Sequence, residues 1–355
     1  MQWIKSKMQT KNMRKTTLKL LLYPLSFLYG LITTLRNYLY DTNILNVNKL
    51  PCKVISIGNI TTGGVGKTPT VEFLALYLQS IGKNVGIVSR GYGRTSKHIK
   101  LVTDGFIKPN SWKQYGDEAF LLSQNLNSIP IVVAESKYEA GLKITSEFDL
   151  DVIIIDDGFQ HRSLHRDLDI VLINSRDTKK THKLLPIGSL REQISGLKRA
   201  DMIIYTKINV HNNLGYLNKL LENVNVEKIN SLLETKSILT GKDRQQIGEI
   251  DLKSKNIYLL SAIGDNIGFK KTVEKIGANI VGHSKFIDHF KFKISDLQKA
   301  QNNAKKASAN YIITTEKDLV KIPNINFEIP IYALKTKMHF SPANKLKNKI
   351  NSLFT

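Results

Sequence analysis

The segment that decides the fold is residues 52–80, CKVISIGNITTGGVGKTPTVEFLALYLQS. Its first six residues predict a buried strand, and residues 70–80 place apolar side chains on one face of a predicted helix. Between them, residues 61–68 form a glycine-rich loop. A strand, a glycine-rich loop and a helix in this order are the setting of a phosphate-binding loop (P-loop). The sequence therefore predicts an α/β fold with a nucleotide site at this loop.

The loop residues have distinct expected roles. Glycines let backbone N–H groups face phosphates without a Cβ in the way, and the following helix adds the positive end of its dipole. Lys67 is expected to reach the β and γ phosphates of ATP as a catalytic cation, and the Thr68 hydroxyl to bind Mg²⁺. The strict pattern G-x-x-x-x-G-K-[ST] fails at Thr61 alone. The predicted ATP-binding residues are Thr61, Thr62, Gly63, Gly64, Val65, Gly66, Lys67 and Thr68.

The remainder of the first half alternates between strands and helices. Strands are predicted over residues 84–89, 130–134, 152–156, 169–173 and 202–205, and helices over residues 117–127 and 136–147. Continuous apolar strands separated by helices favour a doubly wound parallel sheet, with ligands beyond the carboxyl ends of the strands.

Residues 20–35 carry no charge, and basic residues flank them on both sides. As a helix they would be about 24 Å long, short of the roughly 30 Å hydrocarbon core of a bilayer. A narrow polar stripe interrupts a broad apolar face and consists of Lys19, Ser26, Gly30, Thr33 and Asn37. The pattern predicts an amphipathic helix in the membrane interface, with its basic flanks at anionic lipid. A helix packed on the protein's own core and a membrane span are the alternatives.

The second half is predicted to form a smaller α/β unit. Residues 207–255 are rich in Asn and Lys and show a looser pattern. Beyond them, strands are predicted over residues 257–262, 280–281, 311–314 and 331–334, and helices over residues 268–276 and 295–306. We therefore expect three parts: an N-terminal membrane-association segment (residues 1–44), a P-loop core domain (residues 45–225) and a smaller C-terminal domain (residues 226–355).

The composition limits the partners. The 355 residues carry a formal net charge of +22, which favours anionic partners or reflects a lysine-rich proteome. Aromatic residues do not interleave with the basic ones, so no nucleic-acid partner is expected. No obligate protein partner is predicted. The one cysteine, Cys52, rules out an internal disulfide framework and suits the cytosol.

Asp156 and Asp157 end the predicted strand over residues 152–156, at the edge where ligands bind. A carboxylate at this place can hold Mg²⁺ directly or through water. The alternative is that both are loop residues that cap a turn before Gly158.

Three other positions carry chemistry that the sequence alone leaves open. Asp117 opens a predicted helix, either as a base for an acceptor hydroxyl or as the helix cap. Arg90 lies in a basic, glycine-containing loop that suits a phosphorylated substrate or is simply solvated. His161 is a candidate substrate contact. A zinc site at His161 and His165 would need a helix and a third ligand, and the nearby Gly158 argues against the helix.

Eight pieces of the sequence, in the same order, resemble the tetraacyldisaccharide 4'-kinase family, the lipid A 4'-kinases of Gram-negative bacteria. The pieces are residues 20–30, 58–69, 89–94, 116–118, 156–161, 185–192, 288–289 and 315–318. The resemblance implies a phosphotransferase that moves the γ-phosphate of ATP, with Mg²⁺, to the 4'-hydroxyl of a tetraacyldisaccharide 1-phosphate, a lipid A precursor. It also implies a monotopic enzyme at the cytoplasmic face of the inner membrane, with that lipid and an anionic membrane surface as its partners.

The resemblance implies roles for single residues as well. Asp117 matches the general base, and His289 matches a residue of the second domain that assists it. Thr68, Asp156 and Asp157 are the expected metal ligands. Seven more residues match positions that line the substrate or metal region: Arg90, Tyr92, Glu118, Gln160, His161, Arg191 and Glu192. Lys137 stands where members of the family often carry arginine.

Two rival interpretations start from the same loop. A partitioning or cell-division-positioning ATPase also uses a GGVGKT loop, but it carries a lysine where this chain has Thr62. A lipid-binding scaffold with an inactive nucleotide site would be expected to lack catalytic groups. Lys67, Thr68, Asp156 and Asp117 are all present here, so the kinase interpretation is preferred to both.

Overall fold

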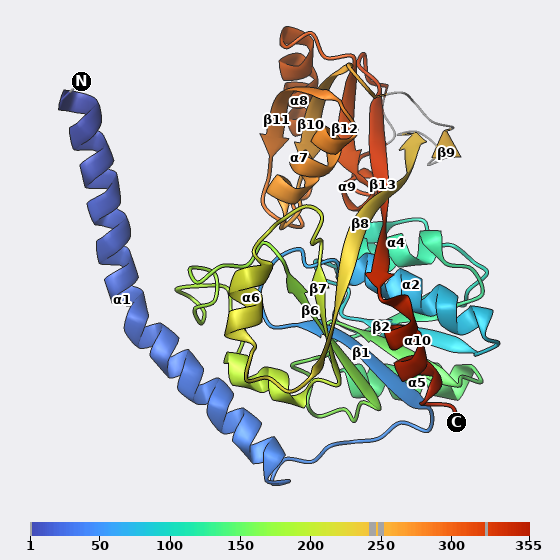
Figure 1. Ribbon diagram of the computed structural model, residues 1–355. Helices are drawn as coiled ribbons and strands as arrows, with labels where there is room; N and C mark the ends of the chain where they lie inside the picture. Colours follow the sequence, from blue (N-terminus) through green and yellow to red (C-terminus); the bar gives the residue numbers. More distant parts are fainter. Residues whose placement is uncertain (1, 241–245, 248–251, 324–325) are drawn as a thin grey trace.

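The computed structural model of the chain describes residues 2–240, 246–247, 252–323 and 326–355. These residues form two lobes and one long N-terminal helix (Figure 1). The first lobe, in the lower half of Figure 1, carries the P-loop. The second lobe, coloured orange and red, lies above it.

The first lobe is built on a parallel sheet. Its strands are β1 (Lys53–Asn59), β2 (Val85–Ser89), β3 (Lys100–Thr103), β4 (Ile131–Val133), β5 (Val152–Asp156), β6 (Leu168–Asn174) and β7 (Met202–Thr206). β1 lies between β5 and β6 and is parallel to both, and only β3, at the edge, is antiparallel to its neighbour among these seven.

Helices cover both faces of this sheet. Ile55 and Ile57 of β1 share a buried cluster with apolar residues of α2 (Lys67–Ser80) and α4 (Asp117–Asn125). Val54, which points to the opposite face, shares one with α5 (Lys137–Glu147). Because both faces are buried, the strands are continuous apolar runs, as the sequence predicted.

The second lobe repeats this plan on a smaller scale. It contains β10 (Asn256–Ser261), β11 (Asn279–Lys285), β12 (Tyr311–Thr315), α7 (Asn266–Lys275), α8 (Ile294–Lys306) and the short α9 (Glu316–Leu319). β10 lies between β11 and β12 and is parallel to both. Phe269 and Val273 of α7 pack on one face of these strands, whereas Leu297 and Ala300 of α8 pack on the other.

Two long strands join the lobes. β8 (Glu227–Thr240) and β13 (Ile331–Ser341) pair antiparallel along their length, and they connect β7 of the first lobe to β12 of the second. The described strands therefore make one 13-stranded sheet in the order β11-β10-β12-β13-β8-β7-β6-β1-β5-β2-β4-β3, in which β9 (Gln246–Ile247) pairs with β8. This mostly parallel sheet with helices on both faces confirms the predicted α/β fold.

The chain crosses between the lobes twice. It enters the second lobe along β8 and returns along β13, after which α10 (Ala343–Asn351) inserts Leu346 and Ile350 into the core of the first lobe beside Val71. The last residues thus belong, by packing, to the first lobe. The predicted domain boundaries at residues 44 and 225 stay predictions.

The looser pattern over residues 207–255 did not reveal three regular elements that the structure describes there. α6 (Leu214–Leu220) and β8 both lie in it, and so does β9. Other short elements that the sequence did not predict are β3, α3 (Trp112–Tyr115), the 3₁₀ helix η1 (Ile194–Arg199) and α10.

The N-terminal helix α1 (Gln2–Asp41) lies along one side of the first lobe, and Figure 1 shows its N-terminal end clear of both lobes. From Ser26 to Asn37, the predicted polar stripe is the side that contacts the protein. Ser26 donates to the carbonyl of Leu184 (3.0 Å), and Asn37 donates to Glu192 (3.1 Å). A Cβ on Gly30 would lie 2.8 Å from the end of the Leu184 side chain, so the helix packs closely on the protein at this point.

The apolar face of α1 is largely exposed. Its side chains are between 51% and 70% exposed: Leu25, Phe27, Leu28, Leu31, Ile32 and Leu35. The alternative in which this face packs on the protein's own core is therefore wrong for residues 22–41. Among the residues that the structure describes, no helix combines the length and the apolar character needed to cross a bilayer.

Candidate active site

A cavity of about 930 Å³ lies between the lobes. Its walls come from the P-loop, the carboxyl ends of β2 and β5, and the second-lobe loops that precede α7 and α9; it also reaches α1 at Tyr29, Ile32 and Thr33. The predicted site residues that line it are Thr62, Gly63, Gly64, Val65, Gly66, Lys67, Thr68, Arg90, Tyr92, Glu118, Asp156, Asp157, Gln160, His161, Arg191 and His289.

The P-loop owes its shape to two glycines. Gly63 and Gly66 have φ angles of 115° and 96°, a region that side chains rarely adopt. α2 begins directly after Gly66. The first N–H groups of a helix have no partner within the helix, so this end of α2 is suited to phosphate binding.

Side chains of the neighbouring strands hold the carbonyl groups of the P-loop. Lys207 and Asn174 donate to the Gly64 carbonyl (2.8 and 3.2 Å), and Thr206 donates to the Val65 carbonyl (2.8 Å). The N–H groups of Thr62 and Val65 donate to the carbonyls of Ser189 and Gly63. The other N–H groups of the loop are suited to an anionic ligand.

Lys67 lies at the end of β1 and β5. Its Nζ contacts the side-chain oxygen of Asn59 (3.1 Å) and Oδ1 of Asp157 (3.3 Å). The ammonium group is therefore held at the wall of the cavity by groups that a phosphate can replace.

Asp157 is tightly paired. Its two oxygens accept hydrogen bonds from Arg191 (2.8 Å each) in addition to the contact with Lys67. Burial alone would raise the pKa of Asp157, but Lys67 and Arg191 outweigh burial and hold it well below the usual range. The backbone N–H of Gly158 donates to the Ile57 carbonyl, so the following turn does not depend on an aspartate cap at this N–H.

Asp156 differs from Asp157 in its hydrogen bonding and in the direction of its pKa shift. It is buried, its Oδ2 accepts from Ser89 (2.9 Å), and its Oδ1 has no hydrogen-bond partner among the described residues. Burial, with a contribution from the nearby Glu118, raises its pKa to about 6. A buried carboxylate oxygen without a partner is costly, so a ligand of this oxygen is expected.

Thr68, Asp156 and Asp157 are suited to binding Mg²⁺ together with phosphate oxygens and water. No group of three or more His, Cys, Asp or Glu side chains that could hold a metal occurs in the described part of the chain. Mg²⁺ in phosphate-transfer sites is usually held by one or two carboxylates together with phosphates and water. Thr68, Asp156 and Asp157 line the same cavity and match this mode.

Lys137 and His161 lie beside the two aspartates. Lys137 is 2% exposed, and its Nζ has no hydrogen-bond partner within the described residues. Burial lowers the pKa of Lys137 to about 8 against the attraction of Asp156 and Asp157. Burial, helped by the charge of Lys137, lowers the pKa of His161 to about 4. His161 is therefore neutral at physiological pH and suited to hydrogen bonding with a ligand.

Asp117 and His289 meet across the two lobes. Nδ1 of His289 lies 3.0 and 2.9 Å from the two oxygens of Asp117, although the residues are 172 positions apart. Asp117 also accepts from the backbone N–H of Glu118 (2.9 Å). It is the first residue of α4 and not its N-cap, which is Gly116, so the alternative of Asp117 as the helix cap is wrong. Burial alone would raise the pKa of Asp117, but His289 and Lys317 outweigh it and lower this pKa.

Lys317 of α9 completes this arrangement. It contacts Glu118 (2.9 Å), Asp288 (3.4 Å) and Nε2 of His289 (3.2 Å). An ammonium group only donates, so this contact requires an acceptor at Nε2 and assigns the proton of a neutral imidazole to Nδ1, facing Asp117. Burial would lower the pKa of Lys317, but Glu118 and the neighbouring aspartates raise it above the usual range.

Close backbone packing brings the arginine-containing loop to the same place. A Cβ on Gly116 would lie 2.7 Å from the backbone of Gly91, so only glycine allows this contact. The ring of Tyr92 lies 4.4 Å from the ring of His289, and Arg90 is exposed and lines the cavity. Arg94 instead donates to the carbonyls of Val133, Lys97 and His98, so it supports its own loop.

The remaining predicted residues differ in position. Gln160 donates to the Asn59 carbonyl and to Glu192 (2.9 Å each). Glu192 is fully buried and also pairs with Arg199 (2.7 Å). It does not border the cavity as Arg191 and Gln160 do. Thr61 and Asp117 are buried behind the lining, at 2% exposure each.

Several cavity residues were not predicted as site residues. Lys317 was part of a sequence marker, but nothing in the sequence gave it a role. Asp265, Lys207 and Arg176 form a second polar contact between the lobes. In the sequence, Asp265 can be recognised only as a helix-capping residue. That position does not indicate that Lys207 and Arg176 pair with it.

The site brings together the parts that phosphoryl transfer requires. A loop with free N–H groups and Lys67 can hold a triphosphate, and carboxylates can hold a divalent cation beside it. On another wall of the same cavity lies His289, which forms with the buried Asp117 behind it a pair that can accept a proton. Lys67 and His289 line the same cavity, and Asp117 lies directly behind His289.

Comparison with known proteins identifies the relatives of this chain. The family profile described as Tetraacyldisaccharide-1-P 4'-kinase matches residues 18–355. A tetraacyldisaccharide 4'-kinase of Bdellovibrio bacteriovorus is 36% identical over 85% of this chain and 88% of its own length. One of Aquifex aeolicus is 34% identical over 94% of this chain and 98% of its own length.

A solved structure gives the same result. The crystal structure of LpxK from Aquifex aeolicus in complex with ATP matches with a TM-score of 0.77 and 34% identity, over 95% of this chain and all of that one. The cell division protein MinD of Aquifex aeolicus has a TM-score of only 0.23, too distant to support the rival interpretation.

Proposed function

The chain belongs to the tetraacyldisaccharide-1-P 4'-kinase family, and on this premise we propose how its own residues carry out the reaction. It transfers the γ-phosphate of ATP to the 4'-hydroxyl of a tetraacyldisaccharide 1-phosphate in lipid A biosynthesis, with ATP and Mg²⁺ as its cofactors. The observation that carries the residue assignments is that the P-loop and His289 border one cavity, with His289 hydrogen-bonded to the buried Asp117.

The P-loop and Lys67 hold the terminal phosphates of ATP. Residues 61–68 supply backbone N–H groups, and Lys67 exchanges its contact with Asp157 for one with the β and γ phosphates. Asp157 remains paired with Arg191 after this exchange. The positive charge of Lys67 then stabilises the negative charge that develops on the phosphoryl group during transfer.

Thr68, Asp156 and Asp157 are the residues that would hold Mg²⁺. Asp156 is the strongest candidate for a direct ligand, because its Oδ1 has no other hydrogen-bond partner among the described residues. The ion supplies charge neutralisation on the phosphate oxygens.

The Asp117–His289 pair accepts the proton of the 4'-hydroxyl. Asp117 is the general base, and His289, which borders the cavity, assists it by holding the carboxylate through Nδ1. Lys317 fixes His289 from the other side. The proton leaves the sugar oxygen as that oxygen attacks the γ-phosphorus and the β–γ bridging bond breaks, with ADP as the leaving group.

The substrate lies between this pair and α1. Arg90, Tyr92 and His161 line that part of the cavity together with Tyr29 and Ile32 of α1. Arg90 is suited to the 1-phosphate, since guanidinium groups bind phosphates through paired hydrogen bonds. Gln160, Arg191, Glu118 and Glu192 contribute by shaping the wall, and Glu192 acts from its buried position through Gln160.

The exposed apolar face of α1 is the membrane contact. A lipid substrate has to reach the cavity from a bilayer, and the cavity opens onto the same helix that exposes Phe27, Leu28 and Leu31. The net charge of +22 favours an anionic bilayer surface. The enzyme is thus peripheral and monotopic, at the cytoplasmic face of the inner membrane of a Gram-negative bacterium, where ATP is available.

A triple variant of α1 tests this assignment. Replacing Phe27, Leu28 and Leu31 by serine removes apolar area from the membrane contact. Co-sedimentation with vesicles of phosphatidylethanolamine and phosphatidylglycerol is expected to weaken by about tenfold or more. Turnover of the lipid in these vesicles should fall in parallel, whereas turnover of the same lipid in detergent should stay close to that of the unmodified chain.

The matched control replaces by serine Phe106 and Ile107, which lie on the loop after β3 and are more exposed than the three residues of α1. This control should leave vesicle binding unchanged. Equal binding by the triple variant and the unmodified chain would show that α1 is not the membrane contact.

A further inference from the structure

Asp265 is a buried carboxylate of the second lobe that is surrounded by side chains of the first lobe. It is 1% exposed and lies at the N-terminus of α7, where its Oδ1 accepts from the backbone N–H of Gly268 (3.0 Å). Arg176 contacts Oδ1 (2.9 Å), and Lys207 contacts Oδ2 (2.9 Å). His211 (3.3 Å) also approaches Oδ2.

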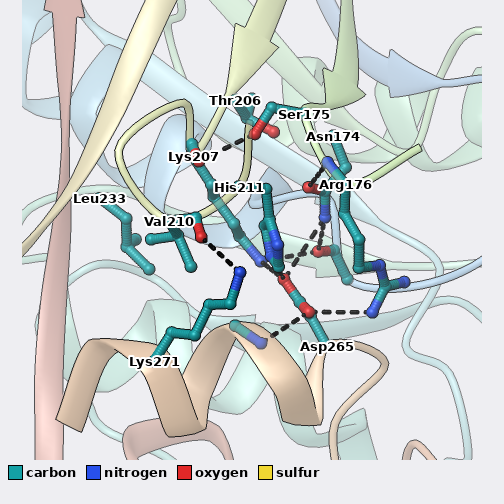
Figure 2. A network of polar contacts seen from close by, with 12 residues as sticks. Asn174, Ser175, Arg176, Thr206, Lys207, Val210, His211, Leu233, Asp265 and Lys271 are labelled. Carbon is teal, nitrogen blue, oxygen red and sulfur yellow. Dashed lines mark hydrogen bonds and ion pairs between the residues drawn. The ribbon is translucent and has the colours of Figure 1, made fainter. Parts of the chain in front are cut away.

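Figure 2 shows this arrangement, with Asp265 at the start of α7 and its partners converging from the opposite side. We call Asp265, Arg176, Lys207 and His211 the Asp265 cluster. Arg176 follows β6 and Lys207 follows β7, so every side-chain partner in the cluster comes from the first lobe.

The cluster also touches the P-loop directly. Lys207 donates from one ammonium group to Asp265 and to the Gly64 carbonyl (2.8 Å). A Cβ on Gly264 would lie 2.5 Å from the backbone nitrogen of Gly64. The second lobe is therefore in backbone contact with the P-loop at this point, and Lys207 ties the two together.

A carboxylate is an unexpected residue on a wall where ATP phosphates bind, because it repels them. Asp265 and Lys207 both line the ATP cavity. Attraction by Lys207 and Arg176 keeps the pKa of Asp265 far below its usual range, although burial alone would raise it. Asp265 is thus an ionised carboxylate whose charge is balanced by neighbouring cations. Such a group is better suited to joining two surfaces than to binding the nucleotide.

The two lobes make a second polar contact at the other side of the cavity, where His289 meets Asp117 and Lys317 meets Glu118. Both contacts depend on the position of the second lobe. A lobe that moved away at Asp265 would also carry His289 and Lys317 away, because all three lie in that lobe: Asp265 just before α7, His289 between β11 and α8, and Lys317 in α9.

We propose that Asp265 is a positioning residue: through Lys207 and Arg176 it fastens the second lobe to the P-loop and so sets His289 against Asp117. The proposal rests on the proposed role of the Asp117–His289 pair in catalysis. In this proposal, the closed arrangement of the lobes depends on the ion pairs of Asp265 beside the P-loop. The P-loop and the Asp117–His289 pair are therefore positioned together.

The test separates this role from a simple helix cap. Asn and Ser both cap helices well, so Asp265→Asn and Asp265→Ser keep the hydrogen bond to Gly268 but remove the negative charge. Both variants are expected to lower kcat by on the order of tenfold. Lys207→Met, which removes the partner from the first lobe, should have the same effect, and Asp265→Asn should add nothing to it.

The decisive readout is a double-mutant cycle with His289→Gln. If Asp265 acts by setting His289 in place, Asp265→Asn lowers kcat in the unmodified chain but causes little further loss once His289 is replaced. Losses that multiply fully in the double variant would overturn the proposal. The matched control is Glu274→Gln, which removes a charge from the exposed face of the same helix and should leave kcat unchanged.

A distance measurement gives an independent check. With Cys52 replaced by serine, spin labels on Ser80→Cys of α2 and Gln298→Cys of α8 report the separation of the lobes. Asp265→Asn should shift this distribution to longer or broader distances. An unchanged distribution in a folded Asp265→Asn protein would overturn the proposal. A His289→Gln variant with full activity would instead contradict the proposed function, so the two failures are distinguishable.

Discussion

Replacing Asp117 by asparagine is expected to lower kcat by about 10²–10⁴-fold, the usual contribution of a general base. Asparagine has the same shape and can still accept a hydrogen bond from His289, but it cannot take a proton from the 4'-hydroxyl. Since the P-loop is untouched, the affinity for ATP should change little. The measurement is the initial rate of phosphate transfer from ATP to the tetraacyldisaccharide 1-phosphate, together with ATP binding by calorimetry.

Asp117 is also buried near Lys317 and Lys321, so loss of its charge has a stability cost that has to be measured. A thermal melt of Asp117→Asn separates unfolding from lost chemistry. Glu147→Gln, at an exposed ion pair of α5, is the matched carboxylate-to-amide control and should be fully active. A folded Asp117→Asn enzyme with turnover near that of the unmodified chain would refute the base assignment.

Replacing Lys67 by methionine should reduce kcat by about 10²–10³-fold, comparable to removal of a group that stabilises charge in a transition state. Methionine keeps the apolar stem but removes the ammonium group that faces the terminal phosphates. ATP affinity should fall as well, because Lys67 contacts the nucleotide before and during the reaction. Steady-state rates at increasing ATP concentration measure both effects.

We expect Lys67→Met to fold, because Asp157, the ion-pair partner of Lys67, remains paired. Asp157 loses one partner but keeps both hydrogen bonds from Arg191. Lys143→Met, the other half of the exposed pair on α5, is the control. If Lys67→Met retained its turnover at saturating ATP, the loop would not be acting on the transferred phosphate, and the nucleotide would have to bind differently.

The sequence predicted the first lobe well because its signals are local. A buried strand, a glycine-rich loop and a helix with one apolar face are all readable within residues 52–80. The carboxyl ends of parallel strands then meet at one edge, which is why Asp156, Lys67 and Arg90 could be expected together before their distances were known.

β8 could not be predicted in the same way. It runs through both lobes, so its burial pattern changes along its length and shows neither steady alternation nor a continuous apolar run. Its pairing with β13 also shifts register between Lys335 and Thr336. Long pairings between distant segments leave no periodic trace in either segment.

The contacts between the lobes show the same limit. The Asp265 cluster joins residues 89 positions apart at Arg176, and a lone aspartate before a helix looks like an ordinary cap. His289 could be assigned only by resemblance to a family. On α1, the pattern showed an apolar face and a polar stripe, but the structure was needed to show that the stripe contacts the protein through Ser26 and Asn37.

The most direct measurement is a structure of the enzyme with Mg²⁺, a non-hydrolysable ATP analogue and the disaccharide 1-phosphate lipid. The account requires the terminal phosphate at Lys67 and the 4'-oxygen within about 2.6–3.2 Å of Asp117 or His289, on the side of the phosphorus opposite the leaving group. A complex in which the 4'-oxygen approaches the phosphate from elsewhere, with the Asp117–His289 pair facing only solvent or the acyl chains, would contradict it.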